Sequence, residues 1–82
     1  MPVIARFYGI VIKMYFTDHL PPHFHAIYNE YNGIFDLDTL GLIEGDLPLK
    51  AVKLVHEWAK DYQNELKKMW DTKEFIKLPG LE

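Results

Sequence analysis

The chain has 82 residues, of which 49% are hydrophobic and 15% aromatic, and its formal net charge is −3. This composition is that of a globular protein and excludes a disordered one, and the acidic balance argues against a general polyanion binder. The absence of cysteine excludes disulfides and thiolate metal sites, and the length allows one domain, so we expect a single α+β domain over residues 1–82.

Residues 3–16 are rich in β-branched and aromatic types, which predicts strand structure. Gly9 inside this run indicates a bulge or a tight reversal. After it, the alternation of strand side chains places four apolar residues on the core face: Ile10, Ile12, Met14 and Phe16. Arg6 and Lys13 interrupt the run, so we expect no signal peptide, no membrane span and a cytosolic protein.

The next predicted strand covers residues 23–28 and follows a loop with two adjacent prolines. Asn32-Gly33 is the strongest hairpin signal in the chain, because both residues tolerate the positive φ of a two-residue type I′ turn. The returning strand is then residues 34–37, and residues 42–44 are a candidate for a short further strand.

Asp-Leu-Pro at residues 46–48 predicts the start of a long helix, because Asp46 can cap the free amides and Pro48 suits the first turn. We expect the helix to run to about Trp70. Its apolar residues recur at steps of three and four and form one stripe: Ala51, Val55, Trp58, Tyr62, Leu66 and Met69. Polar residues occupy the opposite side: Lys50, Lys53, Glu57, Lys60, Asn64 and Lys67.

The strands come first and the helix last, with connections of hairpin length. This order predicts an α+β fold: a small antiparallel sheet of about four strands, a β-meander, with one long C-terminal helix packed across one face. The segment after Asp71 is too apolar for a free tail, so we expect it either to add an edge strand or to dock on a partner.

Three of the four histidines are close in sequence: His19, His23 and His25. In a strand, residues i and i+2 share a face, so His23 and His25 point together while Phe24 points to the core. The predicted two-residue turn pairs odd positions with even ones. It therefore places two carboxylates, those of Asp36 and Asp38, on the histidine face, with Phe35 and Leu37 joining Phe24 in the core.

Three interpretations of this histidine cluster are open. In the first, it binds a divalent metal such as zinc through imidazole and carboxylate ligands, and the candidates are His19, His23, His25 and Asp38. In the second, it performs metal-free acid–base chemistry, as in phosphodiester cleavage, and the candidates are His23, His25 and Asp18. A serine triad is excluded, since the chain has no serine. In the third, which we favour, the histidines donate to nearby carboxylates or to the two-proline loop, or form part of an interface.

The predicted helix also offers a basic face. Residues 1–47 carry two basic and six acidic side chains, a net charge of −4, whereas residues 48–70 carry five basic and three acidic ones, a net charge of +2. Three lysines are candidates for contact with a phosphate backbone: Lys50, Lys53 and Lys60. Glu57 interrupts this face, and solvated helix faces normally have such a composition.

Four segments stand out together: Arg6-Phe7-Tyr8-Gly9-Ile10, Met14-Tyr15-Phe16, Pro21-Pro22-His23-Phe24-His25 and Phe35-Asp36-Leu37-Asp38. In these segments the chain resembles the small bacterial family filed as domain of unknown function 4160, and the resemblance weakens after Trp70. It implies a prokaryotic protein whose gene often lies beside that of another short domain, an arrangement that suggests a two-component, toxin–antitoxin-like pair. The resemblance carries over no catalytic residue.

Three functional hypotheses follow. The leading one is a protein-interaction module whose partner is a small protein encoded by a neighbouring gene, or a second copy of the chain. The alternatives are an enzyme, either a small histidine-based ribonuclease or a metal-dependent hydrolase, and a nucleic-acid-binding transcriptional regulator.

Overall fold

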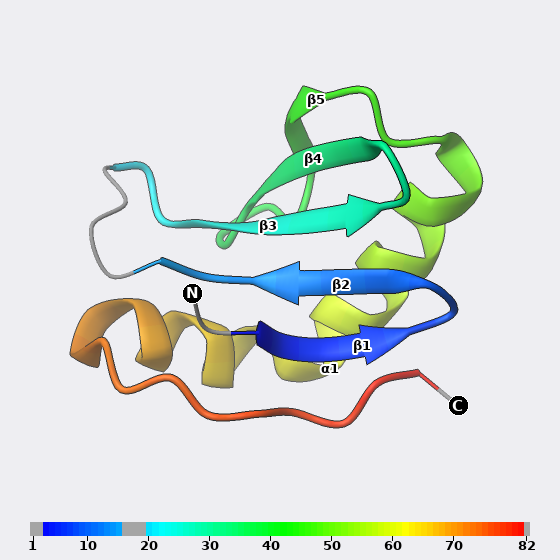
Figure 1. Cartoon of the computed structure of the whole chain (residues 1–82). Coiled ribbons are helices and arrows are strands. Elements are labelled where there is room, and N and C mark those ends of the chain that lie inside the picture. The colour runs from blue at the N-terminus through cyan, green and yellow to red at the C-terminus, as the bar shows by residue number, and fades with distance from the viewer. Residues whose placement is uncertain (1–2, 16–19, 82) are drawn as a thin grey trace.

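The computed structural model describes residues 3–15 and 20–81 and is shown in Figure 1. Within these residues the chain forms five antiparallel strands in the order β1-β2-β3-β4-β5 and then one helix. The bounds are β1 (Val3–Phe7), β2 (Ile10–Lys13), β3 (His23–Tyr28), β4 (Tyr31–Asp36), β5 (Leu42–Gly45) and α1 (Leu49–Thr72). The predicted α+β meander is confirmed. It has five strands because Tyr8-Gly9 is a reversal between β1 and β2.

The turn between β3 and β4 lies at Asn29-Glu30, so the prediction of a hairpin turn at Asn32-Gly33 is wrong. Gly33 is instead buried inside β4, where an added Cβ would come within 2.7 Å of the Leu42 side chain. Close packing, not a positive φ, is the reason for glycine here. The predicted core face is nevertheless confirmed, since Phe24 pairs with Phe35 and both are fully buried.

The core lies between the sheet and α1. Trp58 is fully buried at its centre, with its ring centroid 5.5 Å from that of Phe7 and 6.1 Å from that of Phe24. The predicted apolar stripe of the helix is buried except for Tyr62, which is half-buried. Asp46 does not cap this helix. Its carboxylate accepts a hydrogen bond from the Asn32 amide at 3.1 Å, and α1 begins after Pro48 without a side-chain cap.

The helix is interrupted at Tyr62, where the backbone leaves helical values (φ −120°, ψ 16°). Just after this kink, the side-chain amide nitrogen (Nε2) of Gln63 donates to the backbone carbonyls of Leu37 and Asp38, at 2.7 and 2.9 Å. These bonds fix the second half of α1 to the turn that follows β4. In the part of the chain that the structure describes, no helix has the length and apolar content needed to cross a bilayer.

The C-terminal tail (residues 73–81) runs alongside β1, as Figure 1 shows in orange and red. It is not assigned as a strand, but the Leu78 amide donates to the Ile4 carbonyl at 2.7 Å. The indole N–H of Trp58 donates to the Pro79 carbonyl, also at 2.7 Å. Three apolar side chains of the tail pack on the core: Phe75, Leu78 and Leu81. The tail therefore completes its own domain and covers the β1 edge of the sheet.

Candidate functional site

The start of β3 brings two imidazole rings together. The ring centroids of His23 and His25 are 5.1 Å apart. His23 is buried, with 5% of its surface exposed, whereas His25 is half-buried. Nδ1 of His23 lies 2.7 Å from the Pro21 carbonyl oxygen, and because a carbonyl only accepts, Nδ1 carries a hydrogen. This bond fixes the ring and the end of the loop, as the structural interpretation predicts.

Aromatic rings surround the imidazole pair. The Tyr15 ring meets His25 edge-on with centroids 4.7 Å apart, and the Trp70 ring lies 5.2 Å from that of His23. The Lys73 ammonium lies 3.9 Å above the Trp70 ring. The pair therefore belongs to a packed ring cluster (Tyr15, His23, His25 and Trp70) from two strand ends and the end of α1. Trp70 was not among the site residues predicted from the sequence, because it lies 45 or more residues from the histidines along the chain.

The two predicted carboxylates, those of Asp36 and Asp38, occupy different positions relative to the histidines. Asp36 lies opposite His23 in the β3–β4 ladder, on the face that the sequence predicted. Its Oδ1 accepts hydrogen bonds from the amides of Asp38 and Thr39 at 2.6 and 3.1 Å, so this oxygen shapes the turn. Asp38 lies beyond the strand, exposed, and pairs with Lys67 on α1 at 3.0 Å. The structure thus turns Asp38 toward the helix and does not bring it to the histidines.

A metal at this site stays a prediction. Across residues 3–15 and 20–81, no group of three or more histidine and acidic side chains has the arrangement of a metal site. His19, a metal candidate, and Asp18, a candidate for acid–base chemistry, lie outside the described residues, so their relation to His23 and His25 is not defined. Within the described residues, His23 and His25 are the two metal candidates that lie together, with ring centroids 5.1 Å apart.

The three candidate lysines for nucleic-acid contact, Lys50, Lys53 and Lys60, are all exposed on α1. Glu57 is exposed on the same helix and keeps the local charge mixed. Binding through these lysines stays a prediction. It requires an affinity for RNA or DNA that falls steeply with salt and that is lost when the three lysines are replaced.

A second candidate site is the β5 edge of the sheet, which the sequence did not indicate as a site. Among the residues that the structure describes, β5 pairs with β4 alone, and all four residues of β5 are exposed. Leu42 and Ile43 are 38% and 51% exposed, although both are large apolar residues. The sequence predicted residues 42–44 as a candidate strand, but not that the meander would end there with one side unpaired.

The match to a known family adds to this geometry. The model of the family described as "Domain of unknown function (DUF4160)" matches residues 9–71. Comparisons with curated proteins and with solved structures give no significant match. The matched residues include β2 to β5 and nearly all of α1, and therefore both histidines and the β5 edge. β1 and the C-terminal tail lie outside the match.

Proposed function

We propose that this chain, which belongs to the DUF4160 family, is a protein-interaction module and one half of a two-gene, toxin–antitoxin-like system in the bacterial cytoplasm. The observation that carries the proposal is the β5 edge. A strand with one unpaired side presents free backbone donors and acceptors, and an extended segment of a partner can add to it. Leu42 and Ile43 are the exposed apolar side chains that such a partner would cover.

The charge around β5 favours a different protein over a second copy of the chain. Glu44 in the strand and Asp46 directly after it are both exposed and acidic. Antiparallel pairing of two β5 strands in the register that places Glu44 opposite Glu44 would bring two carboxylates together, and like charges directly opposite are destabilising. A partner strand with lysine or arginine beside an apolar residue complements this edge. The proposed partner is therefore a small protein, encoded by the neighbouring gene, that offers a basic extended segment.

The test is co-expression with the protein encoded by the neighbouring gene, followed by size-exclusion chromatography and a measured Kd. We expect a 1:1 complex in which Ile43→Lys weakens binding by tenfold or more, because it adds a charge at the covered position. Ile76→Lys is the matched control, since Ile76 is similarly exposed (57%) but lies in the tail. The proposal is contradicted if the chain stays monomeric in the presence of the protein encoded by the neighbouring gene. It is also contradicted if Ile43→Lys and Ile76→Lys both leave the Kd of the complex unchanged.

Charge reversal at the same edge is an independent test of the partner's chemistry. Glu44→Lys should weaken the complex and Glu65→Lys, on an exposed position of α1, should not. Because surface charges mainly affect the association rate and are screened by salt, the effect should be larger at low ionic strength. Tighter binding of the Glu44→Lys variant would show that the partner's contact surface is acidic.

A second candidate function is a small ribonuclease or metal-dependent hydrolase built on His23, His25 and either Asp18 or His19. The pair of imidazole rings 5.1 Å apart supports it, since two imidazoles at this separation can act on one substrate or share a metal. Metal analysis of the native protein distinguishes the two versions. A folded His23→Ala, His25→Ala double variant that keeps every activity of the parent rejects both.

A further inference from the structure

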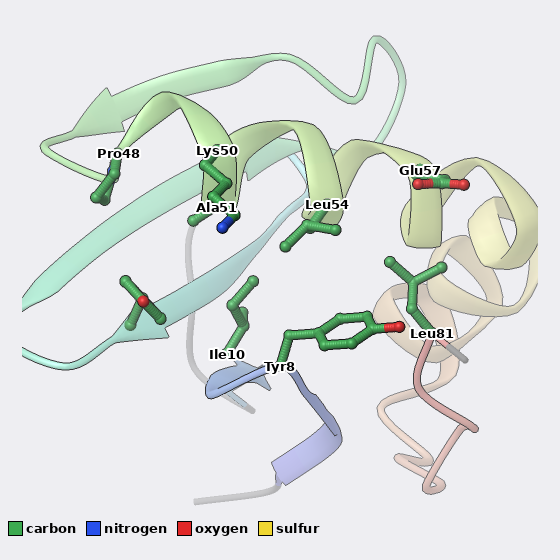
Figure 2. A pocket seen from close by; sticks show the side chains of 9 residues that line it. Tyr8, Ile10, Pro48, Lys50, Ala51, Leu54, Glu57 and Leu81 are labelled. Atoms are coloured by element: carbon green, nitrogen blue, oxygen red, sulfur yellow. The ribbon is translucent and has the colours of Figure 1, made fainter.

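A cavity opens between the β1–β2 turn and the first half of α1, and neither a histidine nor a residue of β5 lines it. Its volume is about 520 Å³, which is within the usual size of a small-molecule site. The turn, two strands, the helix and the tail all contribute to its lining: Tyr8, Ile10, Tyr28, Pro48, Lys50, Ala51, Leu54, Glu57 and Leu81. Figure 2 shows Tyr8 facing Leu54 across the cavity, with Leu81 at one end.

Tyr8 is an unusual residue for its position in the β1–β2 turn. Its φ is +48° and that of Gly9 is +79°, as in a type I′ turn, where asparagine and glycine are preferred. An aromatic residue with positive φ is uncommon and strained. The ring is still 58% exposed, so the domain gains little burial from it. A bound molecule between Tyr8 and Leu54 would cover this exposed ring.

The charged groups at the rim restrict the chemistry of that molecule. Among the residues that the structure describes, neither Lys50 nor Glu57 forms an ion pair. They are seven positions apart on α1, a rise of about 10 Å along the axis. One ammonium group can pair with a single negative charge at one end, while the Glu57 carboxylate at the other end repels a second negative charge and accepts a hydrogen bond.

We infer that this cavity binds an elongated aromatic monocarboxylic acid with a hydrogen-bond donor at the end remote from the carboxylate. The aromatic body lies between Tyr8 and Leu54 on the apolar floor that Ile10 and Ala51 form. The carboxylate pairs with Lys50, and the donor faces Glu57. The site is separate from the edge that a partner would cover, so its occupation does not depend on the interaction proposed above.

The probe is indole-3-propionate, titrated into the full chain and followed by amide chemical shifts. We expect saturable shifts at the lining residues with a Kd on the order of 1 mM or tighter, as a ligand of this size allows. Indole-3-propionamide, which lacks the charge, should bind at least tenfold more weakly, and tryptamine, which is cationic, should not bind at the cavity. Equal binding of the acid and the amide, or shifts that are absent or lie elsewhere, overturns the inference.

Two substitutions test the assigned roles. Tyr8→Asn places a residue that tolerates the turn, so we expect unchanged or higher thermal stability together with a tenfold or greater loss of affinity. Lys50→Met should leave the fold intact and abolish the preference for the acid over the amide. Ile76→Ala, a similarly exposed apolar position outside the cavity, is the control and should bind as the parent does. Affinity unchanged by Tyr8→Asn and Lys50→Met contradicts the inference.

Discussion

The two edge strands of the sheet differ in their cover: the C-terminal tail lies along β1, whereas β5 is exposed. At β1, the tail lies along the strand, donates a hydrogen bond from Leu78 and places Gly80 against the Arg6 carbonyl and the Phe7 side chain. At β5, within the described residues, no segment lies on the outer side, and Leu42 and Ile43 remain exposed. β5 is also short and bulged, features that reduce unwanted pairing of an edge.

This difference shows how a small domain can restrict association to one direction. An uncovered strand edge pairs with any suitable strand, so a sheet with two such edges could assemble into chains of molecules. Covering β1 leaves a single edge, which permits a closed complex with one partner. The covered edge lies outside the matched residues 9–71 and the open edge lies inside them.

The largest expected effect comes from removing the tail. Deletion of residues 74–82 exposes the β1 edge, removes the contacts of three apolar side chains with the core, and leaves the Trp58 indole without its carbonyl partner. We expect a loss of about 3–5 kcal/mol in the free energy of unfolding, measured by urea denaturation. The deleted chain should also self-associate. A monomeric deletion variant within about 1 kcal/mol of the parent would show that β1 does not need its cover.

A single substitution can displace the tail in part. An added Cβ at Gly80 would lie 2.5 Å from the Arg6 carbonyl oxygen, so Gly80→Val must push the tail from β1. The expected loss is about 2 kcal/mol by thermal or urea unfolding. Gly41→Ala is the control, because its Cβ would meet the Thr39 hydroxyl at an ordinary 3.4 Å. Equal effects of the two substitutions would mean that the close contact at Gly80 is not important.

Trp58→Phe examines the bond between the core and the tail. It removes the N–H that donates to the Pro79 carbonyl, and it leaves a smaller ring between Phe7 and Phe24. We expect a loss of about 1–2 kcal/mol, of which roughly 1 kcal/mol is the hydrogen bond. Amide exchange of residues near Leu78 should become faster in the variant. If exchange there is unchanged, the indole does not hold the tail.

The smallest expected effect is at the open edge. Ile43→Thr removes an apolar surface that the domain itself hardly buries, so the free energy of unfolding should change by no more than about 0.5 kcal/mol. The same substitution should weaken the complex with the neighbouring-gene protein several-fold, as competition or calorimetry would show. A large loss of stability would instead assign Ile43 to the fold of the free domain.

Much of the sheet could be predicted from the sequence. The core and histidine faces of β3 and β4 were predicted correctly, although the turn between these strands was placed wrongly. The hairpin turn lies at Asn29-Glu30 instead of Asn32-Gly33, a shift of three positions. Both turns have two residues and both pair odd positions with even ones, so the paired residues of β3 and β4 keep their predicted faces. The face of the sheet to which a side chain points depends on whether odd positions pair with odd or with even ones, and the alternation of side chains along a strand specifies this well. The location of the turn depended on Gly33, whose role is to make room for Leu42.

The features that were not predicted depend on contacts between distant residues. The kink at Tyr62 accompanies the bonds from Gln63 to the turn after β4, and no local helix breaker announces it. Asp38 lies in the turn after β4, where it pairs with Lys67, 29 positions later. Trp70 joins the histidines only once α1 has packed on the sheet. Such contacts follow from tertiary packing, which periodicity along the chain does not encode.

The most direct test of the account is amide hydrogen–deuterium exchange of the full chain, alone and with the protein encoded by the neighbouring gene. In the free chain, residues 42–45 should exchange faster than residues 3–7, because one edge is open and the other covered. On complex formation, protection should rise at least tenfold in residues 42–45 and stay unchanged in residues 3–7. New protection at β1, or at His23 and His25 without any at β5, would contradict the assignment of the interaction to the open edge.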